Sequence, residues 1–153
     1  MGEKANSITV HTDEEIKGFF GEYRWLSNYY SCKVFYKGRE FTSSEAAYQS
    51  AKQTDPEIVS FFQTLTGKES KEASRHYSIP PDWDDIKTAI MYEILYDKFT
   101  RNSELKEKLI ATGDRYLEET NWWGDEYWGV CKGKGENVLG KILMKIRSMI
   151  DLQ

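Results

Sequence analysis

Apolar side chains recur at helical spacing through most of the chain after residue 55. Positions i, i+3, i+4 and i+7 are apolar over residues 56–66, 83–100, 104–112 and 138–150, which predicts four amphipathic helices. Each follows a residue that commonly caps a helix: Asp55, Asp82, Ser103 and Asn137. The polar stretch 68–77 predicts a shorter helix that ends before Pro80 and Pro81.

One more helix is predicted from about Ser43 to Gln53. The segment Thr42-Ser43-Ser44-Glu45 has the spacing of a capping box, in which a hydroxyl caps the helix and a glutamate returns the hydrogen bond. In that interpretation Glu45 is a structural residue of the helix start.

Strand signals are weaker and shorter than the helix signals. Residues 19–41 are dense in aromatic and β-branched residues, which predicts short strands with a hairpin turn at Tyr36-Lys37-Gly38-Arg39. Residues 116–120 could form another strand, and the polar residues 1–17 are expected to be loose. The pattern as a whole predicts the α+β class: one helix-dominated domain over residues 18–153 with a few short strands near the N-terminus.

Composition and charge exclude several functions. Hydrophobic residues make up 39% of the chain and charged residues 30%, which is typical of globular proteins, and the net charge is −4. The absence of a polybasic block disfavours bulk binding to nucleic acid. The start carries no basic segment followed by an apolar run, and no stretch approaches membrane-spanning length, so we expect a cytoplasmic protein without membrane contact.

The sequence carries no recognisable metal or cofactor motif. The two cysteines, Cys32 and Cys131, and the two histidines, His11 and His76, do not have metal-ligand spacing. The glycines near residue 134 match neither a Walker loop nor a convincing dinucleotide fingerprint. We therefore expect chemistry from side chains alone, with no metal and no cofactor.

Glu45, Tyr48, Gln49 and Lys52 fall at i, i+3, i+4 and i+7, so they share one face of the predicted helix. A carboxylate, a phenol, an amide and an amine on one face could form the wall of a cleft. The alternative is a solvated stripe whose glutamate only caps the helix.

A second candidate is the segment 121–129, which has no regular period and holds three tryptophans and a tyrosine around Asp125 and Glu126. Carboxylates beside aromatic surface are suited to acid or base catalysis, and a ring such as Trp128 can stack on a nucleobase. The alternative is a hydrophobic plug beneath a long loop.

Phosphate could bind at two weak candidate sites. Gly133, Lys134, Gly135 and Asn137 lead into the last helix, where bare amides and a helix N-terminus can hold an anion, although a flexible turn is the alternative. Near the start, Arg24 offers a guanidinium for bidentate phosphate binding, and Ser27 and Asn28 can hydrogen-bond a sugar or base.

Taken in order, these segments resemble the NADAR, or YbiA-like, family of N-glycosidases, which act on ribosylated nucleotides and related ADP-ribose conjugates. The resemblance covers roughly residues 19–150. The matching pieces are Leu26-Ser27-Asn28-Tyr29, Ser44-Glu45 through Tyr48-Gln49 to Lys52, Trp83 with Lys87 and Met91, Lys98-Phe99, Leu105 to Leu109, Glu118 to Thr120, Asp125-Glu126-Tyr127-Trp128-Gly129, Gly133-Lys134-Gly135-Glu136-Asn137, Leu139-Gly140 and Leu143-Met144 to Arg147.

Two positions depart from the family pattern. Ala46 stands where many members have a histidine, and Val130-Cys131 stands where the family is usually acidic and rich in glycine. The first removes a possible proton carrier, and the second bears on substrate choice.

The resemblance implies hydrolysis of a ribose C1–N bond in a phosphorylated, nucleotide-like substrate. The substrate would be a ribosylaminopyrimidine phosphate of the riboflavin pathway or ADP-ribose attached to a nucleobase. Glu45 and Asp125 would be the catalytic carboxylates, Lys52 a nucleophile that forms an imine with the ribose, Trp128 a stacking surface, and Arg24 with Lys134 a phosphate clamp. A non-catalytic module that binds ADP-ribose or a related NAD metabolite is the alternative function.

Overall fold

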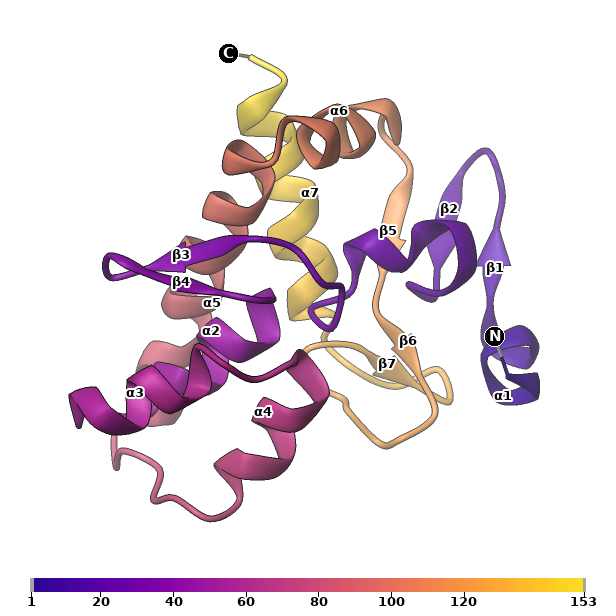
Figure 1. The fold of residues 1–153 in the computed structure, drawn as a ribbon. Helices are drawn as coiled ribbons and strands as arrows, with labels where there is room; N and C mark the ends of the chain where they lie inside the picture. The colour runs from indigo at the N-terminus through magenta and orange to yellow at the C-terminus, as the bar shows by residue number, and fades with distance from the viewer. Residues whose placement is uncertain (1, 153) are drawn as a thin grey trace. The chain divides into compact units, whose positions relative to one another are not determined.

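The computed structural model describes residues 2–152, and the chain forms two compact units. One unit comprises the chain up to Ser27 together with the chain from Glu107 onward, and the other comprises residues 28–106. Figure 1 shows the elements in chain order. Helices dominate and the strands are short, so the α+β prediction is confirmed.

The unit of residues 28–106 contains six elements: β3 (Val34–Tyr36), β4 (Arg39–Phe41), α2 (Ser44–Ser50), α3 (Pro56–Phe62), α4 (Gly67–Ser74) and α5 (Trp83–Arg101). The other unit contains α1 (Glu3–Ile8), β1 (Val10–His11), β2 (Glu15–Lys17), the 3-10 helix η1 (Gly21–Leu26), β5 (Tyr116–Glu118), β6 (Thr120–Asn121), β7 (Val130–Cys131) and α7 (Val138–Ile150). Helix α6 (Ser103–Ala111) includes the point where the chain passes from one unit to the other.

The predicted hairpin is confirmed in β3 and β4. The two strands pair antiparallel, with Tyr36 opposite Arg39. Lys37 and Gly38 both have positive φ, 50° and 76°. Two central residues of that kind make the tight turn whose twist suits a two-residue hairpin.

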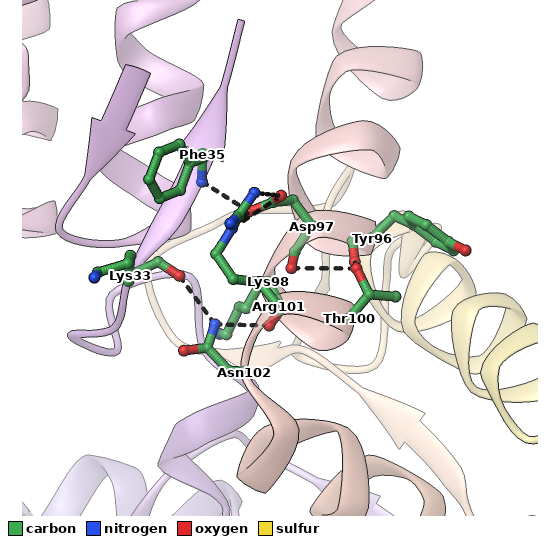
Figure 2. A network of polar contacts seen from close by, with 8 residues as sticks. All are labelled: Lys33, Phe35, Tyr96, Asp97, Lys98, Thr100, Arg101 and Asn102. Carbon is green, nitrogen blue, oxygen red and sulfur yellow. Dashed lines mark hydrogen bonds and ion pairs between the residues drawn. The ribbon is translucent and has the colours of Figure 1, made fainter. Parts of the chain in front are cut away.

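Polar contacts attach the C-terminal end of α5 to strand β3, as Figure 2 shows. The Asp97 carboxylate accepts a hydrogen bond from the Phe35 backbone amide at 2.7 Å and forms an ion pair with Arg101 at 2.8 Å. Asn102 donates from Nδ2 to the Lys33 carbonyl at 2.9 Å. These bonds give the edge of the hairpin a fixed position on the helix that carries Trp83 at its other end.

The other unit is built on a three-stranded sheet in the order β1-β2-β5. Strand β1 pairs antiparallel with β2, and β2 pairs parallel with β5. Residues 1–17 were expected to be loose, but within the described part of that range the chain forms α1, β1 and β2. Ile16 is fully buried and pairs with Leu117, so a contact distant in sequence orders this segment.

Helix α7 packs closely on β5, and Gly140 makes this possible. A Cβ atom at residue 140 would collide with the Leu117 carbonyl oxygen and the Asn137 side chain. Close packing therefore explains a glycine inside a helix, where it usually weakens the element.

The start of α2 differs from the predicted capping box. Ser43 is the cap, and its Oγ accepts from the Ala46 amide at 3.1 Å. The Thr42 hydroxyl instead donates to the Leu65 carbonyl at 2.5 Å. A true capping box occurs at the start of α4, between Thr66 and Glu69. Glu45 is thus not used as the capping carboxylate, which was the structural interpretation of this residue.

Several other boundaries also moved. Residues 21–26 form a 3-10 helix rather than a strand. Helix α3 ends at Phe62, before the predicted residue 66, and Gly67 begins α4. Asp82 and Asn137 precede helices but make no side-chain cap bond. No helix in residues 2–152 combines the length and apolar character needed to cross a membrane.

Candidate active site

The four polar residues predicted to share a face lie at α2 and its C-terminal end, and we call them the α2 polar face: Glu45, Tyr48, Gln49 and Lys52. Glu45 is 6% exposed and Gln49 is 2% exposed. Tyr48 is also buried, and Lys52 is half-buried. A solvated stripe would be open to water, so the face is not a solvated stripe.

Glu45 and Gln49 are directly bonded one helical turn apart. The Gln49 Nε2 donates to Glu45 Oε2 at 2.6 Å, a short hydrogen bond. The Gln49 Oε1 is buried and has no hydrogen-bond partner among the described residues. The hydrogen bond holds the carboxyl group in one orientation, as a general acid or base requires.

Helix α4 approaches Glu45 closely at Gly67. A Cβ at residue 67 would lie 3.1 Å from the Ser43 Oγ and 3.3 Å from the Glu45 Cβ. Only glycine therefore fits this approach without displacing its neighbours. The predicted helix over residues 56–66 stops just before Gly67, and the packing role of this glycine was missed because the neighbour across the contact is distant in sequence.

The Lys52 amine lies against two aromatic rings. Its Nζ is 5.6 Å from the ring centroid of Tyr48 and 5.6 Å from that of Trp83. Burial lowers the pKa of Lys52, and the nearby cations Lys71 and Lys87 lower it further, against the opposing effect of Glu45. A lowered pKa enlarges the neutral fraction of the amine, which is the nucleophilic form.

The three predicted residues near the start have different surroundings. Asn28 is buried: its Oδ1 accepts from the Ser44 hydroxyl at 2.9 Å, and its backbone carbonyl accepts from the Glu45 amide at 3.0 Å. Asn28 therefore supports the first turn of α2. Ser27 is half-buried, and Arg24 is exposed with one guanidinium nitrogen donating to the Gly21 carbonyl at 3.1 Å. The structure pairs Asn28 with the α2 polar face; Arg24 and Ser27 belong to the other unit.

The segment after β6 is an ordered loop, and Asp125 organises it. The Asp125 Oδ1 accepts from the backbone amides of Tyr127 at 3.1 Å and Trp128 at 3.0 Å. Asn121 bonds both to the amide and to the carbonyl of Asp125, at 3.1 Å and 2.9 Å. These bonds fix the Trp128 backbone.

The tryptophans of this loop do not form a buried plug. Trp122 is 39% exposed and Trp123 is 49% exposed, and both pack against Phe20. Trp128 is half-buried, with its ring centroid 4.9 Å from that of Tyr127 in an edge-to-face arrangement. Aromatic surface is therefore open in this unit.

The glycine-rich segment before α7 is a tight turn. Most of the backbone amides that were expected to bind phosphate donate hydrogen bonds to backbone carbonyls instead. Cys131 and Lys134 exchange backbone hydrogen bonds at 2.8 Å and 3.0 Å. The amides of residues 136–139 donate to carbonyls of residues 126–129, so the N-terminus of α7 is already occupied.

The Asn137 side chain is also used structurally, in bonds to the Leu117 carbonyl and the Glu119 amide. Three groups of the predicted phosphate site take no part in the hydrogen bonds described here: the exposed Lys134 side chain and the backbone amides of Gly133 and Gly135.

Across residues 2–152, no group of three or more histidine, cysteine, aspartate or glutamate side chains is arranged to hold a metal ion.

Comparison with known proteins gives three informative relatives. A riboflavin biosynthesis protein of Vibrio vulnificus is 36% identical over 92% of this chain, which spans only 37% of that protein. An N-glycosidase of Nostoc punctiforme is 32% identical, with 84% of this chain and 86% of that protein covered. The N-glycosidase YbiA of Escherichia coli is 28% identical over 100% of this chain and 99% of its own length.

The fold is also similar to a solved structure. The NMR structure of Escherichia coli YbiA superposes with a TM-score of 0.81 at 25% identity, covering 97% of this chain and 92% of that one. The family model described as NADAR domain matches residues 15–151. With nearly the whole chain matched, this protein belongs to the NADAR domain family.

Proposed function

We propose that the chain is an N-glycosidase that hydrolyses the bond between a ribose anomeric carbon and a nitrogen. The observation that carries the proposal is the buried carboxylate of Glu45, bonded to Gln49 and followed one further turn along by an amine of lowered pKa, Lys52. Two relatives that match over most of their length are named N-glycosidases. A buried carboxyl group beside an amine of lowered pKa is able to support that activity.

The reaction begins at a ribose carried on an exocyclic amine. Protonation of the ring oxygen opens the ring and leaves an iminium between the anomeric carbon and the substrate nitrogen. The neutral amine of Lys52 adds to that carbon, a proton passes to the substrate nitrogen, and the free amine departs as the carbon–nitrogen bond breaks. Water then adds to the Lys52 imine and releases the sugar, so that one water is consumed for each bond broken. Glu45 carries the protons.

Glu45 suits that role because it is held rather than free. Its bond to Gln49 fixes the position of the carboxyl group, which can give a proton to the ring oxygen, take one from the attacking amine and return it to the leaving nitrogen. Asp125 is the second candidate carboxylate and Trp128 the candidate stacking surface; both roles rest on the family motif and stay predictions.

The substrate is a phosphorylated ribosyl compound: a ribosylaminopyrimidine phosphate or ADP-ribose joined to a nucleobase. The name of the Vibrio vulnificus relative supports the first, and the net charge of −4 favours a small molecule over a nucleic-acid polymer. Arg24 and Lys134 are exposed cations that could hold the phosphate.

The test is incubation of the pure protein with each substrate, with mass spectrometry of the products. The proposal expects the free amine base and, in equal amounts, the free ribosyl product, which is ribose phosphate from the first substrate and ADP-ribose from the second. Binding of substrate without release of the base would instead identify a non-catalytic module that binds ADP-ribose or a related metabolite.

A further inference from the structure

The side-chain amide of Gln49 has a hydrogen-bond partner for its nitrogen but none for its oxygen among the described residues. Its nitrogen donates to Glu45 at 2.6 Å, while its oxygen is buried without a partner among the described residues. Because the Glu45 oxygen accepts from the amide nitrogen, the amide oxygen points away from Glu45. The orientation of this amide is therefore set by Glu45.

A buried acceptor without a partner destabilises a protein. Such a group has lost its hydrogen bonds to water without gaining any from the protein, and side chains as buried as Gln49, at 2% exposure, are normally paired. The working protein must supply a donor at this point, either a water or a group of the bound molecule.

We propose that the Gln49 Oε1 accepts a hydrogen bond from the ribose hydroxyl next to the anomeric carbon. This inference rests on the proposed function, in which Glu45 acts at the anomeric carbon. One amide group separates the Gln49 Oε1 from the Glu45 carboxylate, and the 2-hydroxyl is the donor on the neighbouring carbon of the sugar. Gln49 thus determines specificity for ribosyl over 2-deoxyribosyl groups, because a site with a buried acceptor rejects an analogue that lacks the donor.

The inference is tested by binding of two simple probes, ribose 5-phosphate and 2-deoxyribose 5-phosphate, measured by calorimetry. Wild-type protein is expected to bind the ribose probe about ten- to a hundredfold more tightly, the range for one buried hydrogen bond. Gln49→Met keeps the length of the side chain but removes the acceptor, and it should bind the two probes equally. A general loss of structure would weaken the binding of both probes equally and leave the ratio of their dissociation constants unchanged.

Gln53→Met is the matched control, one turn further along. Gln53 is more exposed and its Nε2 donates to the Ser78 carbonyl at 3.2 Å, so the replacement should retain the preference for ribose. Gln49→Leu provides a second apolar variant if Gln49→Met does not fold, as judged by circular dichroism.

The possible failures are distinct. Equal binding of both probes by wild-type protein, or a preference for ribose that persists in both Gln49 variants, would overturn the inference and leave the N-glycosidase proposal intact; a resident water or the substrate amine would then be the donor. Failure of wild-type protein to bind either probe, together with no release of base in the product assay, would overturn both.

Discussion

At the scale of single residues, two lysines in different surroundings have different roles. Lys52 lies at the surface end of the α2 polar face, against the rings of Tyr48 and Trp83. Lys98 lies in α5 with no exposed surface, and its Nζ is 5.1 Å from the ring centroid of Phe99. Burial lowers the pKa of both side chains. Lys52 is half-buried and can contact a substrate, whereas the fully buried Lys98 affects the stability of the fold.

Lys52→Arg is expected to abolish cleavage and imine trapping. Arginine keeps the positive charge but cannot be deprotonated to a nucleophile. Borohydride added during turnover should attach the sugar phosphate to Lys52 in wild-type protein, found by peptide mass mapping. Retention of most of the turnover in Lys52→Arg, with no adduct in wild-type protein, would show that water attacks directly with Glu45 or Asp125 as the base.

Lys98 should make the free energy of unfolding rise with pH. Burial lowers the pKa of Lys98 to about 8, while an unfolded lysine has a pKa of about 10.4. Between these values the unfolded state binds more protons, so raising the pH favours the folded state by roughly 3 kcal/mol across the window, and this gain is absent below pH 8.

Denaturant titrations of wild-type and Lys98→Met protein at pH 7 and pH 10 test this expectation. The free energy of unfolding of the variant minus that of wild type should fall over this range, because methionine does not titrate. The exposed Lys68→Met replacement is the control. A difference that stays constant with pH would contradict the expectation.

The residues of the α2 polar face could be predicted from sequence because helical periodicity is local. Their burial could not, since it depends on groups that reach them from other elements. Gly67 and the Trp83 ring reach Glu45 and Lys52 from α4 and α5. The structural roles of Asn28 and Asn137 were also missed, because their bonds join segments far apart in the sequence.

At the scale of elements, α2 and α4 form the most closely fitted pair near the candidate site. The contact passes through Gly67, where no side chain separates the two helices. Gly67 does not have a positive φ, so its backbone could be adopted by other residues. The requirement for glycine at this position is therefore one of space.

Gly67→Ala is expected to lower both stability and activity. The new Cβ would lie 3.1 Å from the Tyr29 Cδ1 and 3.3 Å from the Glu45 Cβ. Overpacking of this kind costs ~1–3 kcal/mol, and a displaced carboxylate should reduce kcat/KM. Chemical denaturation and steady-state kinetics are the measurements, with the exposed Lys68→Ala on the same helix as control. Wild-type values for both quantities would show that the contact is not important.

The elements that sequence predicted well are those with local causes. The β3–β4 hairpin follows from two turn residues, and α5 and α7 follow from long apolar stripes. The sheet β1-β2-β5 was not foreseen, because β2 pairs with a strand about a hundred residues later in the chain. Helix α2 was predicted to begin at about Ser43 and begins one residue later, at Ser44, since Thr42 and Ser43 could each have been the cap.

At the scale of the whole molecule, candidate residues occur in both compact units. The α2 polar face belongs to residues 28–106, while Asp125 and Trp128 belong to the other unit. The prediction that they take part in one reaction comes from the family motif. That prediction can be tested by measuring substrate binding by a Trp128 variant.

Trp128→Ala is expected to raise the dissociation constant of the substrate while leaving the fold intact. Stacking of a base on an aromatic ring is worth ~1–3 kcal/mol, which corresponds to a loss of affinity of about ten- to a hundredfold. The exposed Trp123→Ala is the matched control in the same loop. Unfolding of the Trp128 variant, seen by circular dichroism, would instead identify Trp128 as a structural residue of the loop.

The rate of base release by Glu45→Gln protein tests the proposed N-glycosidase most directly. Glutamine keeps the size of the side chain but cannot carry the proton, so kcat should fall at least about a hundredfold, the lower end for loss of a general acid or base. Glu57→Gln, an exposed glutamate in α3 of the same unit, should leave kcat unchanged. Base release by Glu45→Gln at the wild-type rate would contradict the assignment of the reaction to the α2 polar face.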